Sequence, residues 1–261
     1  MPPSVAEMTP GRLEGGRVLV VGAGTADGGA SDAPVGNGRA IAVRCGREGA
    51  HVVCADVVQA AAETTATLVE AQGATAETVV GDVASAADCA AIVAGAGELT
   101  GLVLNVGIGR GRGLARTTVD DWDTTFAVNL RSHFLLAQAA LPSMGAGSSI
   151  VFIGSVAGLQ PGSRMPAYDS SKAGIIGLCR HVAMEGARRG VRANVVCPGL
   201  IDTPLGRAAS SGRPSREATP VPLGRQGTAW EVAAAVVFLL SADASYVTGD
   251  VLTVDGGLHL I

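Results

Sequence analysis

The chain has 261 residues, a net charge of −4, and a composition that is 48% hydrophobic but only 3% aromatic. It carries no basic run and no apolar stretch near the roughly 20 residues of a membrane span, which argues against nucleic acid and membrane as partners. Five scattered cysteines without metal-ligand spacing indicate reduced, buried thiols in a cytoplasm and no metal centre.

Short apolar runs alternate with segments of helical period along the chain. After residues 1–15, which we expect to be a flexible tail, the runs expected to form strands are 17–21, 51–55, 78–80, 102–104, 149–153, 191–196 and 251–254. Three intervening helices open with capping-box patterns, at Ser85, Thr118 and Thr228. Without a linker or a repeat, this alternation predicts one α/β domain over 16–261, a doubly wound parallel sheet of about seven strands with helices on both faces.

Tyr168 and Lys172 are four residues apart, which places them one above the other on the same face of a helix. A neighbouring ammonium favours the phenolate and so lowers the pKa of a tyrosine from about 10. Such a tyrosine can exchange a proton with an alcohol or a carbonyl near neutral pH. The pair alone is a weak signal, because any helix can carry it. Ser155 strengthens it, since a strand over 149–153 followed by a loop and this helix would bring all three polar groups to one rim.

Ser155, Tyr168 and Lys172 with this spacing, and the segments 154–158 and 193–199, resemble the short-chain dehydrogenase/reductase family over about residues 16–258. The resemblance implies a Rossmann-type fold in which Tyr168 removes a hydroxyl proton while the substrate carbon gives hydride to a nicotinamide. Ser155 would bind the substrate oxygen. Lys172 would hold the cofactor ribose and pass the proton outward through a water held by Asn129. A second interpretation is that Asn129 is a buried mid-helix residue that bonds to backbone, and the two roles are compatible.

The glycine turn after the first expected strand departs from the family pattern. In the family this turn lets the backbone approach the cofactor pyrophosphate at a helix N-terminus. Gly22 matches the first glycine, but the closing Gly36-Asn37-Gly38 comes ten residues later than in the family. We therefore interpret residues 26–35 as an insert looped out of the turn, and a polar surface flap is the simplest account of it.

The resemblance also assigns the other cofactor contacts. Asp56, at the end of the second expected strand, would accept hydrogen bonds from the adenosine ribose and repel a 2′-phosphate, which favours NAD over NADP. Its alternative is the N-cap of the following helix. The family's adenine, turn and nicotinamide contacts match Asp82, Val83, Asn105, Gly107, Pro198, Gly199, Ile201 and Thr203, and Tyr168 and Lys172 also face the cofactor.

Residues 203–224 contain four prolines and occupy the place of the family's mobile substrate lid. Arg207, Arg213 and Arg216 in this segment would suit an anionic substrate, although solvated lid charges are the more frequent explanation. The helix that begins at Tyr168 is apolar nearly all round, so it needs a partner beyond its own sheet. The family packs this helix and the Asn129 helix across a subunit interface, and a homotetramer is expected.

The expected activity is NAD-dependent interconversion of a small-molecule secondary alcohol and its ketone. Two alternatives stay open. One is a non-catalytic dinucleotide sensor, which is disfavoured because Ser155, Tyr168, Lys172 and Asn129 are all present. The other is a 3-oxoacyl-thioester reductase, whose usual preference for NADPH is at odds with Asp56.

Overall fold

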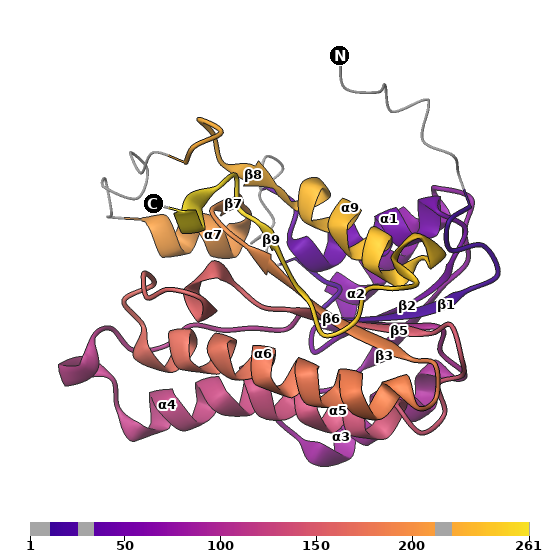
Figure 1. Ribbon diagram of the computed structural model, residues 1–261, viewed down its shortest axis with the longest axis horizontal. Helices are drawn as coiled ribbons and strands as arrows, with labels where there is room; N and C mark the ends of the chain where they lie inside the picture. The colour runs from indigo at the N-terminus through magenta and orange to yellow at the C-terminus, as the bar shows by residue number, and fades with distance from the viewer. Residues whose placement is uncertain (1–10, 26–33, 212–220, 261) are drawn as a thin grey trace.

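Seven parallel strands form the central sheet of the computed structural model, which describes residues 11–25, 34–211 and 221–260 (Figure 1). Their order is β3-β2-β1-β4-β5-β6-β9. The strands are β1 (Arg17–Val21), β2 (His51–Asp56), β3 (Ala76–Val80), β4 (Gly101–Leu104), β5 (Ser149–Ile153), β6 (Arg192–Pro198) and β9 (Val251–Val254). The predicted parallel sheet is confirmed. A second, two-stranded sheet pairs β7 (Ile201–Asp202) with β8 (Gly227–Thr228) and was not expected.

Helices cover both faces of the sheet, as predicted. One face packs against α1 (Asn37–Arg47), α2 (Gln59–Glu70) and α9 (Ala229–Leu240). The other packs against α3 (Ala86–Ala96), α5 (Ser132–Ala140) and α6 (Pro166–Ala187), with α4 (Val119–Phe126) alongside α6 (Figure 1). The short helix α7 (Pro204–Ser210) lies in the expected lid segment. None of the helices in the described ranges is long and apolar enough to cross a membrane.

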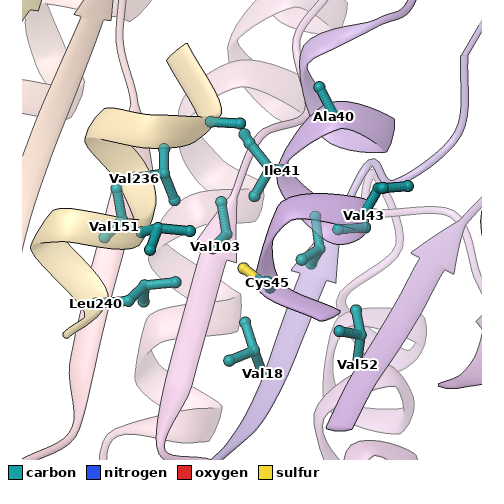
Figure 2. Close-up of a cluster of buried hydrophobic side chains, with 14 of the residues drawn as sticks. Val18, Ala40, Ile41, Val43, Cys45, Val52, Val103, Val151, Val236 and Leu240 are labelled. Atoms are coloured by element: carbon teal, nitrogen blue, oxygen red, sulfur yellow. The ribbon is translucent and has the colours of Figure 1, made fainter. Parts of the chain in front are cut away.

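The two cores follow from the alternation of side chains along each strand. In β1, Val18 and Val20 face α1 and α9, whereas Leu19 and Val21 face α3 and α5. Figure 2 shows the first of these cores, where valines of β1, β4 and β5 pack against α1 and α9. Both faces of the sheet are therefore apolar, which explains why the strands read as continuous Val and Leu runs.

The predicted helix starts at Thr118 and Thr228 are complete capping boxes. Each threonine side chain accepts the N–H of the third helical residue, and each threonine N–H donates to the carboxylate of that same residue. At α3 only half of the predicted box forms. Ser85 accepts the N–H of Asp88 (3.2 Å), but the Asp88 carboxylate accepts the N–H of Asp82 (2.9 Å) instead of that of Ser85.

The packed part of the chain begins before Gly16. Leu13 is buried, and its N–H donates to the carbonyl of Glu48 (2.9 Å). The segment 1–15, expected to be flexible, thus ends in a packed turn, and its residues 1–10 lie outside the described residues. The same holds for residues 26–33 of the expected insert and 212–220 of the expected lid.

All five cysteines are buried and unpaired, as the sequence predicted. Burial raises the pKa of the Cys54 and Cys179 thiols to about 12, because a thiolate is poorly solvated in an apolar core. These thiols therefore stay neutral at physiological pH and act as small apolar side chains.

Candidate active site

The strand order reverses between β1 and β4, and at such a switch point the carboxyl ends of the strands leave a crevice. A cleft of about 1430 Å³ lies there. It is lined by every predicted site residue except Asn129, namely Gly22, Gly36, Asn37, Gly38, Asp56, Asp82, Val83, Asn105, Gly107, Ser155, Tyr168, Lys172, Pro198, Gly199, Ile201 and Thr203. Asn129 is fully buried behind this wall.

The glycine turn brings α1 into direct contact with the end of β1. Gly22 has φ +80°, and a Cβ on Gly38 would lie 1.8 Å from the Gly22 carbonyl oxygen. Only glycine fits at position 38, so α1 starts against the turn. No side chain caps the first turn of α1, and the buried amide oxygen of Asn37 has no hydrogen-bond partner in the described part of the chain. An uncapped helix N-terminus that opens into a cleft favours an anion such as a pyrophosphate.

The two ends of the expected insert lie side by side. The N–H of Gly36 donates to Thr25 Oγ1 (3.1 Å), and a Cβ on Gly36 would lie 3.5 Å from the Gly24 carbonyl oxygen. Thr25 and Gly36 are therefore as close together as the two ends of a short glycine turn. The interpretation of residues 26–35 as an insert stays a prediction, because residues 26–33 lie outside the described residues.

Asp56 braces the same turn from the end of β2. Its Oδ2 accepts the N–H of Gly24 (2.8 Å), and its Oδ1 accepts the N–H of Val58 (3.0 Å). The N-cap of α2 is Val58, so the N-cap alternative for Asp56 is wrong. A carboxylate has about four acceptor positions, and two backbone amides leave room for ribose hydroxyls.

Asn105 ties the end of β4 to the glycine turn, because its Nδ2 donates to the Gly22 carbonyl (2.8 Å). Gly107 follows two residues later, and a Cβ there would lie 3.2 Å from Lys172 Nζ. A side chain at position 107 would therefore crowd the ammonium. This contact explains the glycine of the turn that the family resemblance identified.

Ser155, Tyr168 and Lys172 all line the cleft. Helix α6 begins at Pro166, so Tyr168 and Lys172 occupy its first two turns, and Lys172 Nζ lies 5.8 Å from the centroid of the Tyr168 ring. Nζ donates to the carbonyl of Ile153 (2.9 Å), the last residue of β5, and Ser155 follows two residues later.

Burial shapes the electrostatics of this rim. Lys172 is 3% exposed, and desolvation of its ammonium lowers the pKa from 10.5 to about 8. The group is still mostly cationic at neutral pH. The positive charge beside the Tyr168 ring is therefore retained, and it favours the phenolate form of Tyr168.

Asn129 lies in a π-helical turn, Ala127–Arg131, between α4 and α5. Its Oδ1 accepts the N–H of Ile108 (2.8 Å), while its Nδ2 donates to the Ile108 carbonyl (2.9 Å) and to Ser171 Oγ (3.1 Å). The backbone-bonding alternative for this residue is therefore observed. Through these bonds Asn129 joins the loop after β4 to α6.

Sequence reasoning missed two residues behind the rim, Ser171 and His133. Ser171 is the partner of Asn129 on α6, and its position next to Lys172 was the available signal. His133 Nε2 lies 3.0 Å from the Leu104 carbonyl at the end of β4, and burial lowers the imidazole pKa to about 3. A neutral His133 therefore donates from Nε2 and holds the start of the loop that contains Asn105 and Gly107.

The segment after β6, which was expected to contact the nicotinamide, is tightly packed. A Cβ on Gly199 would lie 2.5 Å from Asp255 Cβ, so only glycine fits there. Thr203 is the N-cap of α7, with Oγ1 accepting the N–H of Gly206 (3.0 Å).

Arg207, one of the arginines considered for an anionic substrate, is bidentate to Asp202 (2.6 and 3.0 Å). Arg213 and Arg216 lie outside the described residues.

Comparison with known proteins supports an oxidoreductase. Residues 33–259 match the family model described as enoyl-(acyl carrier protein) reductase. The chain is 40% identical over 238 residues to 2-(S)-hydroxypropyl-CoM dehydrogenase 3 of Xanthobacter autotrophicus, covering 87% of this chain and 93% of the relative. It is 37% identical over 270 residues to the (3R)-3-hydroxyacyl-CoA dehydrogenase of Canis lupus familiaris, covering 97% and 99%.

Solved structures agree with the fold. A double mutant of a Serratia marcescens short-chain dehydrogenase/reductase superposes with a TM-score of 0.86 at 30% identity, covering 95% of this chain and 99% of that one. A blue fluorescent protein from a metagenomic library, in complex with NADPH, superposes with a TM-score of 0.83 at 33% identity, covering 95% and 99%. The chain belongs to the short-chain dehydrogenase/reductase family, oxidoreductases that bind a nicotinamide dinucleotide and interconvert the alcohol and carbonyl forms of small-molecule substrates.

Proposed function

We propose that this chain is an NAD-preferring dehydrogenase that interconverts a secondary alcohol and its ketone, with Tyr168 as the general acid and base. The observation that carries the proposal is the buried Lys172 ammonium, 5.8 Å from the Tyr168 ring at the rim of a cleft that Ser155 also lines. A positive charge held beside a phenol favours the phenolate, which is the form that takes a proton from an alcohol.

Each polar group of the rim has its own part in the proposed chemistry. Bound NAD would supply the carbon that accepts a hydride from the alcohol. The Tyr168 oxygen takes the hydroxyl proton, and the Ser155 hydroxyl donates a hydrogen bond to the substrate oxygen as it becomes a carbonyl. Lys172 holds its charge beside the phenolate. Asn129, fixed by Ile108 and Ser171, supports the loop that passes Lys172.

The cofactor cleft fits a dinucleotide. The uncapped start of α1 suits a pyrophosphate, because its first N–H groups have no side-chain cap. Asp56 supports a preference for NAD, because its carboxylate lines the cleft where an adenosine ribose would lie and its charge would repel a 2′-phosphate.

A second candidate is oxidoreduction of a 3-hydroxyacyl thioester. The relative named (3R)-3-hydroxyacyl-CoA dehydrogenase, which aligns with 97% of this chain, favours it. The chemistry at Tyr168 would be the same, since the reacting group is again a secondary alcohol. The two candidates differ only in the part of the substrate beyond the reacting alcohol and in the protein residues that would bind that part.

We also propose that the enzyme is a cytoplasmic homotetramer. A groove on the outer side of α4, α5 and α6 is lined by Phe126, Leu130, Phe134 and Leu178, and Phe134 is 45% exposed. A contiguous apolar surface of this kind is typical of a subunit contact. The five unpaired, buried thiols support this location, because disulfides are rare in reducing compartments.

Oxidation of a panel of secondary alcohols with NAD, followed by NADH absorbance, tests the proposed function. We expect turnover of at least one secondary alcohol and none of the matched tertiary alcohols, which have no hydride to give. Tight NADH binding without turnover of any alcohol or reduction of any ketone would instead support the dinucleotide sensor.

A further inference from the structure

The two ends of the cleft differ in charge. Carboxylates line only the adenosine end, at Asp56 and Asp82. From Gly107 onward the described lining residues include no carboxylate, and their charged side chains are the buried Lys172 and the exposed Arg112. The described wall of the substrate end is therefore electropositive, and among these residues a negative group meets no like charge.

Arg112 differs from the neighbouring arginines in its side-chain contacts. Within the part of the chain that the structure describes, its side chain has no hydrogen-bond or ion-pair partner. Its neighbours differ. Arg110 Nη1 lies 3.8 Å from Asp120 Oδ2, and Arg207 is bidentate to Asp202. Of these three arginines, Arg112 alone has its guanidinium available to a ligand.

The backbone beside Arg112 is held in place from two sides. The N–H of Gly113 donates to the Arg164 carbonyl (2.8 Å), and the Gly113 carbonyl accepts the N–H and the hydroxyl of Thr117 (3.2 and 2.8 Å). Arg164 has φ +67° and is the non-glycine residue with a positive φ in the described ranges. That conformation costs about 1 kcal/mol or more. The strained residue thus lies where the loop before α6 meets the Arg112 loop, and the hydrogen bond from Gly113 to the Arg164 carbonyl joins the two loops.

The same loop passes the proposed catalytic tyrosine. A Cβ on Gly109 would lie 3.8 Å from Tyr168 Cδ2, and Arg112 follows three residues later. Three residues span at most about 10 Å. The guanidinium is therefore placed to reach a group on the same small molecule whose carbinol lies at Tyr168.

We propose that Arg112 anchors an anionic group at the far end of the substrate, so that the substrate class is a secondary alcohol with a carboxylate, sulfonate or phosphate tail. This rests on the proposed function at Tyr168. A planar guanidinium binds two oxygens of such an anion at once, and the fixed loop reduces the entropy lost on binding.

The test measures kcat/KM with saturating NAD for racemic (ω−1)-hydroxy carboxylic acids of increasing chain length and for their methyl esters. The matched sulfonate of the best length distinguishes the source of the anion. We expect the acid to be favoured over the ester by about 10-fold at one or more lengths, the size of one charge-assisted contact. Arg112→Gln should bring this ratio to about one. Arg110→Gln, on the same loop but paired with Asp120, should leave it unchanged.

The preference for the acid should also decrease with added salt, because the contact is exposed to solvent. A ratio that survives in Arg112→Gln, or esters that match the acids at every length in the wild type, would overturn the anchor and leave the dehydrogenase function standing. Turnover of neither series would overturn the proposed substrate class. The alcohol panel described above then tests the proposed function by itself.

Discussion

Replacing Lys172 should change how the stability of the protein depends on pH. Lys172 is the only lysine in the 261-residue sequence, and burial lowers its pKa from 10.5 to about 8 in the folded state. Below pH 8 both states carry the ammonium, and the folded state bears the full cost of burying it. Between pH 8 and 10.5 the unfolded chain keeps a proton that the folded chain has lost, so stability rises with pH. The whole difference corresponds to about 3 kcal/mol.

Lys172→Met keeps the apolar stem and removes the charge. Most of this total, roughly 2 to 3 kcal/mol, falls between pH 7 and pH 10. We therefore expect the free energy of unfolding of the wild type, relative to Lys172→Met, to rise by this amount over that interval. Loss of the bond to the Ile153 carbonyl adds a constant offset that cancels in the comparison. The raised pKa values of the Cys54 and Cys179 thiols act in the opposite direction and cancel as well, because neither thiol interacts with Lys172.

Urea denaturation of both proteins at pH 7 and pH 10, followed by the fluorescence of Trp122 and Trp230, measures the difference. A second measurement uses ¹³C-labelled lysine, because a single side chain then gives the whole signal and its titration midpoint should lie near pH 8. A midpoint above pH 10, or parallel stability curves for the two proteins, would refute the argument that burial perturbs Lys172.

Three further changes have defined outcomes. Gly38→Ala places a Cβ 1.8 Å from the Gly22 carbonyl oxygen and should weaken NADH binding by about 10-fold or more in a fluorescence titration. Gly145→Ala meets no atom within 4 Å and should not weaken it. Asp56→Ser should raise the kcat/KM ratio of NADP to NAD by about 10-fold, and a wild type that uses both cofactors equally would contradict the role of this carboxylate. Phe134→Glu, in the groove on α4 to α6, should reduce the mass in light scattering from that of a tetramer, and an unchanged mass would place the interface elsewhere.

The sequence predicted the sheet and the rim residues because both depend on local pattern. Buried parallel strands appear as continuous apolar runs, such as 149–153 in β5. The spacing of Tyr168 and Lys172 is fixed by helix geometry, and both lie at the start of α6. The start of α1 could be predicted because the helix-opening glycines reappear at Gly36 and Gly38.

Other features depend on contacts between distant segments. The partner of Asn129 is the backbone of Ile108, 21 residues away, and that choice is made by packing of the loop after β4. Asp56 braces Gly24 across two strands instead of capping α2. Leu13 is buried only because the turn at Glu48 lies beside it. Neither composition nor periodicity carries information of this kind.

The most direct test of the account is Tyr168→Phe, which removes one hydroxyl group and keeps the ring beside Lys172. With the alcohol that the wild type oxidises best, turnover should fall by at least about 10²-fold, the usual contribution of a positioned acid or base. The dissociation constant for NADH should stay within about 2-fold of the wild type, because a lost proton acceptor does not change ground-state binding of the cofactor. Near-normal turnover in this variant would contradict the assignment of Tyr168 as the group that exchanges the proton.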